Sequence, residues 1–208
     1  MIRRLTAIAT AFAATPALAH HPLGGETPTT LVHGLLSGVG HPVIGLDHLA
    51  FVIAVGIAAT FTARPLLMPL ALVAATLVGT LVHLASIGLP LVEVVIALSV
   101  LALGAMLLSG RAFGAATYAA MFAVAGLFHG HAYGEAIFGA EATPLVAYLV
   151  GFGAVQWAIA AGAGLLLGRG SRVVAGAPNG AARLTGAMVA GAGVLLVSDH
   201  AFAALGWA

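Results

Sequence analysis

The sequence predicts an all-α fold, a bundle of six transmembrane helices that follows a cleavable N-terminal signal peptide. Of the 208 residues, 62% are apolar and only 6% are charged, whereas about a quarter of the residues in a soluble domain are charged. Apolar segments of bilayer-spanning length recur along the chain, without the period-two alternation of a membrane barrel strand. This composition excludes a water-soluble globule, and so few cations argue against a nucleic-acid partner.

The first residues have the pattern of a secretory signal peptide. Two arginines precede an apolar run over residues 5–14, and Ala17-Leu18-Ala19 supplies a small-x-small cleavage pattern. The apolar run is about half as long as a spanning helix. We therefore predict that residues 1–19 are removed and that residues 20–208 form a single membrane domain.

Six apolar segments of spanning length follow, separated by short breaks that contain Pro, Gly or Arg. Small residues recur at helical spacing in the last two segments, which favours close helix packing. The predicted helices cover residues 43–61, 66–87, 91–109, 113–131, 145–168 and 184–205.

The arginines predict the topology. If the mature N-terminus lies outside, the first, third and fifth connections face the cytoplasm, and these connections hold every arginine of the mature chain. The fourth connection instead holds Glu135 and Glu141. We expect a multi-pass protein of the bacterial inner membrane with both mature ends in the periplasm. The five arginines are Arg64, Arg111, Arg169, Arg172 and Arg183.

Histidines and acids gather at one depth of this predicted bundle, in the outer half. An ionised side chain at the centre of a spanning helix costs about 2.5 to 3.5 kcal/mol, so a cluster of such groups indicates a site. Because cysteine is absent, imidazole and carboxylate are the available metal ligands, and they suit divalent nickel, cobalt, zinc or copper. The clustered residues are His41, Asp47, His48, His83, Glu93, His129, His131, Glu135, Asp199 and His200.

Two of these groups have informative spacings. His41 and His48 are seven residues apart, which places them on one face of the first predicted helix, with Asp47 beside them and Pro42 in its first turn. In the fourth helix, His131 and Glu135 are one turn apart, whereas His129 lies on another face. We expect local unwinding there, because glycines flank these positions and irregular helices are common at transport sites.

Two motifs carry a resemblance to a known family. Residues 41–48 read H-P-x-x-G-x-D-H, and residues 128–135 read F-H-G-x-A-Y-G-E. Together with the signal peptide and six helices, they resemble the HupE/UreJ family of nickel/cobalt permeases over essentially the whole mature chain. Many members have a histidine in place of Tyr133 and a glutamate one residue after Glu135.

The resemblance implies a permease that imports Ni(II) or Co(II), with the metal ion as substrate and no permanently bound cofactor. We assign the primary ligands to both motifs and a further metal path to His83, Glu93, Asp199 and His200. Cleavage before His20 would place His20 and His21 beside a free amine, a nitrogen-rich group that could capture metal outside. The primary set is His41, Asp47, His48, His129, His131 and Glu135.

The predicted mechanism is secondary transport, because the chain has no G-x-x-x-x-G-K-[ST] motif for ATP. Transport should weaken as the external pH falls below about 6.5, since ligating imidazoles must be neutral. The same residues would also suit an intramembrane zinc-dependent hydrolase that acts on a lipid amide or ester. A proton- or electron-carrying subunit is a third interpretation, and the sequence predicts no oligomeric state.

Overall fold

The computed structural model describes residues 26–167 and 180–206, and all regular secondary structure in this part of the chain is helical. The predicted signal peptide, His20, His21, Arg169 and Arg172 lie outside the described residues. Seven α-helices and one short 3-10 helix occur in the described segments. They are α2 (Leu31–Ile44), α3 (Leu46–Ala59), α4 (Leu70–Leu84), α5 (Val92–Leu108), α6 (Ala115–Gly134), η2 (Glu135–Ile137), α7 (Ala142–Leu167) and α8 (Gly180–Ala204).

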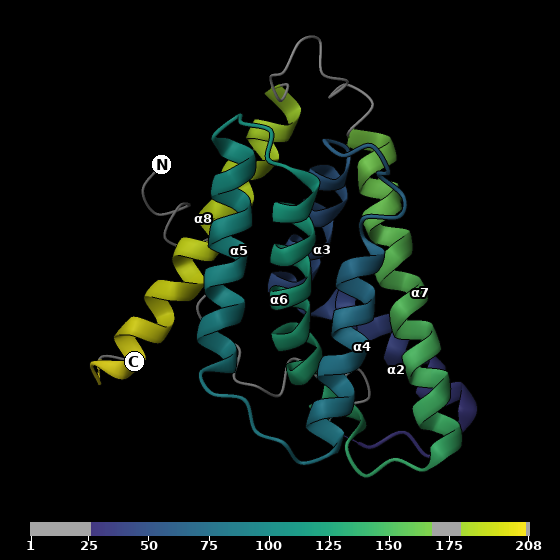
Figure 1. The fold of residues 1–208 in the computed structure, drawn as a ribbon. Coiled ribbons are helices and arrows are strands. Elements are labelled where there is room, and N and C mark those ends of the chain that lie inside the picture. The colour runs from purple at the N-terminus through teal and green to yellow at the C-terminus, as the bar shows by residue number, and fades with distance from the viewer. Residues whose placement is uncertain (1–25, 168–179, 207–208) are drawn as a thin grey trace, which may run out of the picture.

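The helices form an elongated bundle in which the connections alternate between two ends (Figure 1). The α3–α4 and α5–α6 connections lie at one end, whereas the α4–α5 and α6–α7 connections lie at the other, with the end of α8. Arg64 and Arg111 belong to the first pair of connections. The Arg183 Nε donates to the Leu108 carbonyl at 3.3 Å, which joins the start of α8 to the same end. All three described arginines therefore share one end.

By length and composition, α7 and α8 are each able to cross a membrane, and α2 with α3 forms a third candidate span that is bent by 80°. The helices α4 and α5 are apolar but shorter, with 15 and 17 residues. The all-helical prediction is confirmed for the described residues, together with two spans, or three when the bent pair counts as one.

The first predicted helix differs from the observed one. The chain is already helical from Leu31, because the Thr30 side chain accepts from the His33 N–H at 3.1 Å and caps the helix. Pro42 therefore lies near the end of α2 and not in a first turn. Proline has no N–H for the carbonyl four residues earlier, and α2 ends two residues later. Gly45 then adopts an extended conformation before α3 begins.

Glycines allow the helices to approach closely where the site is built. A Cβ on Gly130 of α6 would collide with the Thr76 carbonyl of α4, and one on Gly79 of α4 would collide with the Leu127 carbonyl of α6. Gly56 has the same relation to α7, through the Ala160 carbonyl. These contacts fix the depth of α3 and α6 relative to their neighbours.

A buried apolar cluster fills the bundle between the motif residues and the arginine end. It runs along α3 from Phe51 to Ala58 and along α6 from Tyr118 to Ala125. Leu103 of α5 and Val189 of α8 complete it from the opposite side. The buried polar residues of α3 and α6 therefore lie at the boundary of a buried apolar core.

Candidate metal site

Three histidines from three helices meet beside the α2–α3 break. His41 lies in the last turn of α2, His48 in the first turn of α3 and His129 near the end of α6. Their side chains are buried, with exposures of 2%, 3% and 2%. The Nδ1 atoms of His48 and His129 are 3.0 Å apart, and the ring centroids of His41 and His48 are 6.4 Å apart. His48 and His129 thus form the close pair of this histidine cluster.

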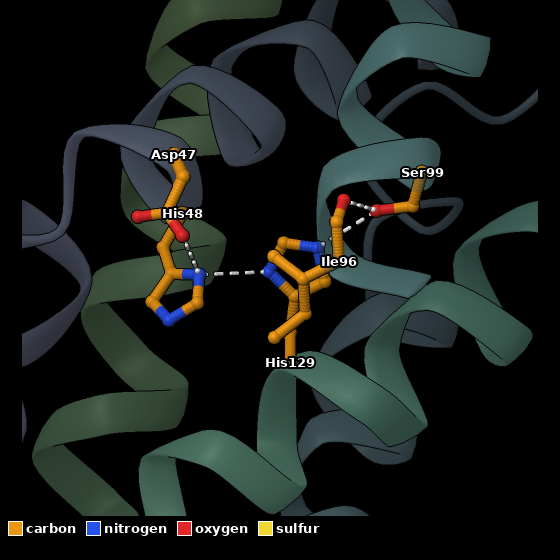
Figure 2. Close-up of polar contacts among 5 residues, drawn as sticks. All are labelled: Asp47, His48, Ile96, Ser99 and His129. Atoms are coloured by element: carbon orange, nitrogen blue, oxygen red, sulfur yellow. Dashed lines mark hydrogen bonds and ion pairs between the residues drawn. The ribbon is translucent and has the colours of Figure 1, made fainter. Parts of the chain in front are cut away.

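Asp47 brings a carboxylate to the same place. Its Oδ2 lies 3.5 Å from the His48 Nδ1, and its side chain is 12% exposed. Figure 2 shows the contact between His48 and His129, with Asp47 beside His48 and on the side away from His129. Asp47 lies in the first turn of α3, where the helix dipole favours a negative charge. Local helix polarity therefore supports an ionised carboxylate beside the histidine pair.

Aromatic rings form the walls of the histidine cluster. The Tyr133 ring lies edge-on to His48 and His41, with centroid distances of 4.3 Å and 4.8 Å. Phe51 stacks on His129 at 4.5 Å. The Tyr133 hydroxyl is buried and has no hydrogen-bond partner among the described residues. The rings restrict the orientations that the imidazoles can adopt.

His131 belongs to a second group on another side of α6. Its ring centroid lies 4.7 Å from that of His83, and its Nε2 lies 3.0 Å from the Ile87 carbonyl. Two residues correspond to about 200° around a helix, which explains why His129 and His131 face apart. The unwinding expected at this place does not occur, since α6 is continuous to Gly134.

The other residues predicted for the metal path lie nearer the surface. Glu93 in the first turn of α5, Glu135 at the start of η2 and Asp199 near the end of α8 are exposed, and His200 is half-buried. The structure therefore does not place them in the buried histidine cluster. Nowhere in residues 26–167 or 180–206 do three His, Asp or Glu side chains lie close enough to hold one ion.

Comparison with known proteins defines the family. The family model described as "HupE / UreJ protein" matches residues 8–196 of this chain. The chain belongs to the HupE/UreJ family. This HupE/UreJ protein is also 33% identical over 178 residues to "Protein HupE" of Rhizobium leguminosarum bv. viciae, an alignment that covers 84% of this chain and 91% of that protein. No solved structure matches it significantly. Family membership and the spanning helices make it a multi-pass membrane protein.

Two residues that contact the cluster were not predicted from the sequence. The Ser99 Oγ of α5 lies 2.9 Å from the His129 Nε2, and the Tyr148 hydroxyl of α7 lies 3.0 Å from the His41 Nδ1. Neither residue belongs to a motif, and a serine or tyrosine in an apolar helix gives no spacing signal. In this HupE/UreJ protein, Ser99 and Tyr148 come close to the histidines only through the packing of α5 and α7 in the folded bundle.

Proposed function

We propose that this HupE/UreJ protein is a secondary permease that imports Ni(II) or Co(II) across the bacterial inner membrane. Its relation to "Protein HupE" supports this function, as does the resemblance of both motifs to those of nickel/cobalt permeases. The path would open on the periplasmic side, and Ni(II) or Co(II) would be the transported substrate.

The buried pair His48 and His129 is the observation that carries the proposal. Two imidazole nitrogens, each about 2.1 Å from one ion and at right angles, would lie about 3.0 Å apart. The observed Nδ1–Nδ1 distance is 3.0 Å. Both nitrogens could therefore bind one dication without a large movement of α3 or α6. Asp47 and His41 are the nearest further ligands and would complete the set by side-chain rotation.

The cost of burial supports a functional role for the cluster. Polar side chains at membrane depth are expensive, and ionisable ones usually line a substrate or ion path. Packing alone would be served by an apolar residue at His48, whose side chain is buried and lies against the Tyr133 ring. A carboxylate beside two imidazoles instead offsets part of the charge of a dehydrated dication.

We propose a second station for the ion nearer the periplasm. His83 and His131 lie at the C-terminal ends of α4 and α6, at the end of the bundle opposite to the arginines. Glu93 and Glu135 lie near the same end, on the surface. Asp199 and His200, near the end of α8, would contribute from the side. An ion would pass from this group to the histidine cluster and then inward.

The proposed topology has six spans and both mature ends in the periplasm. The bent pair α2–α3 would act as one span, and α4 to α8 would supply five more. The common end of Arg64, Arg111 and Arg183 would face the cytoplasm, as the positive-inside rule requires. A signal peptide over residues 1–19 and metal capture by His20 and His21 remain part of this proposal.

A hydrolase is the less favoured function. Catalytic zinc sites need three protein ligands around one ion, and the described residues contain no such group of His, Asp or Glu. The histidines instead fall into two groups that face different sides of α6. Ligands divided between two neighbouring groups favour transport over catalysis at one closed centre.

Nickel accumulation tests the proposal. In nickel-starved cells that express the protein, we expect His48→Ala to lower ⁶³Ni uptake at least tenfold, since even the loss of an outer-shell partner costs about 10- to 100-fold at metal sites. His33→Ala is the matched control, because His33 is exposed on α2. Equal uptake by wild type and His48→Ala at matched membrane levels would contradict the proposal.

A further inference from the structure

A neutral imidazole binds a metal ion only through the nitrogen that carries no proton. Which nitrogen that is depends on the hydrogen bond that the other nitrogen makes. Two of the clustered histidines, His129 and His41, each place one ring nitrogen against a buried hydroxyl group. The direction of these two hydrogen bonds therefore determines which ring atoms are available to an ion.

The Ser99 hydroxyl is placed to accept a hydrogen bond from His129. The Ser99 hydroxyl has one proton and donates it to the Ile96 carbonyl at 2.7 Å, because a carbonyl oxygen can only accept. The Ser99 Oγ therefore accepts from the His129 Nε2–H at 2.9 Å. Figure 2 shows this chain from Ile96 through Ser99 and His129 to His48. The His129 Nδ1 is left with its lone pair, directed at the His48 Nδ1.

The Tyr148 hydroxyl has the same arrangement. It donates to the Tyr133 carbonyl at 2.9 Å, so it accepts from the His41 Nδ1–H at 3.0 Å. Tyr148 is fully buried and stacks on Phe152 with an angle of 12° between the rings, which holds the hydroxyl in place. The His41 Nε2 is then the ring atom that retains a lone pair.

We infer that Ser99 and Tyr148 are positioning residues that fix the tautomers of His129 and His41. Each hydroxyl commits its proton to a backbone carbonyl and so forces the facing imidazole to donate. Without an ion, His48 then donates its Nδ1–H to the His129 Nδ1. An ion that binds both Nδ1 atoms requires the His48 proton to move to its Nε2. The consequence for metal binding rests on the proposed function, whereas the tautomer assignment does not.

Nitrogen NMR tests the assignment without metal. In protein labelled with ¹⁵N-histidine, we expect the His129 signals of an Nε2–H tautomer and the His41 signals of an Nδ1–H tautomer, identified by their loss in His129→Gln and His41→Gln. Ser99→Ala should shift His129 to a mixture of tautomers, and Tyr148→Phe should do the same for His41. Unchanged tautomers in both variants would overturn the inference.

The controls separate this effect from a general disturbance of the helices. Ser109→Ala removes the hydroxyl of the residue that follows α5. This hydroxyl also donates to the carbonyl three residues earlier, at 2.7 Å, but it contacts no imidazole in the described part of the chain. Tyr118→Phe removes the hydroxyl of a buried tyrosine in α6. The Tyr118 ring packs against Phe113 and Phe122. Both controls should leave the signals of His129 and His41 in place.

Equilibrium binding of Ni²⁺ to the purified protein tests the consequence. We expect Ser99→Ala and Tyr148→Phe to weaken binding about 10- to 100-fold, the effect typical of outer-shell partners, and Ser99→Thr to restore it. Altered tautomers with unchanged nickel affinity would overturn the positioning role. If the wild-type protein binds no nickel, the proposed function fails, and the NMR comparison still decides the tautomers.

Discussion

The contact between His48 and His129 joins residues that are 81 positions apart in the chain. The sequence predicts both as ligands because histidines and acids gather in the outer half of the predicted bundle. The structure brings them together with His41 and Asp47, whereas Glu135 and Asp199 remain on the surface. Spacing identified the residues of α3 and α6, but it could not show the hydroxyl groups of α5 and α7 that contact them.

The Asp47 carboxylate is expected to strengthen ion binding through its negative charge. Asp47→Asn keeps the shape of the side chain and removes this charge beside the His48 Nδ1. We expect the nickel concentration for half-maximal uptake to rise about 10- to 100-fold. Glu141→Gln, which removes an exposed carboxylate before α7, should leave it unchanged. An unchanged value for Asp47→Asn would exclude the carboxylate from the site.

At the level of the elements, the α2–α3 break decides the geometry of the cluster. A continuous helix would place His41 and His48 on one face, as their spacing predicts, but the chain bends by 80° between them. The signals for the break were present in Pro42 and Gly45. The same two residues also fit the start of a helix, because proline is common in a first turn. Sequence alone could not decide, since the outcome depends on α7 packing against both helices.

The packing of α4 against α6 should be intolerant of a side chain at Gly130. A Cβ there would collide with the Thr76 carbonyl, and backbone on both sides leaves little freedom to adjust. We expect Gly130→Ala to destabilise the protein by about 1 to 3 kcal/mol or more, as overpacking does. The measurement is the Tm of the purified protein by circular dichroism.

Gly162→Ala is the matched control for this experiment. Gly162 lies within α7, and a Cβ there would meet no atom of residues 26–167 or 180–206 within 4 Å. Alanine is also the better helix former, so the Tm of Gly162→Ala should equal or exceed that of the wild type. A Tm for Gly130→Ala that matches the control would show that α4 and α6 are not in close contact.

For the whole molecule, the arginines carry most of the topological information. Their positions predicted alternating connections, and the structure places Arg64, Arg111 and Arg183 at one end of the bundle. The all-helical class also follows from composition, because apolar runs without period-two alternation form helices in a membrane. The number of spans was harder to predict, since α4 and α5 are short and the first apolar segment is bent.

Single cysteines can test the orientation, because the natural chain contains none. Glu141→Cys, before α7, and Ala112→Cys, between α5 and α6, lie at exposed positions at opposite ends. A membrane-impermeant maleimide should label Glu141→Cys in intact spheroplasts and Ala112→Cys only after permeabilisation. The wild type should remain unlabelled throughout. The opposite pattern would invert the proposed topology.

The central claim is that His48 and His129 bind the same ion, and nickel X-ray absorption of the metal-loaded protein tests it most directly. We predict the multiple-scattering signature of at least two imidazoles in the wild type. His48→Ala and His129→Ala should each remove one of them, and the control His33→Ala should remove none. A wild-type spectrum without imidazole, or one that neither His48→Ala nor His129→Ala changes, would contradict the account.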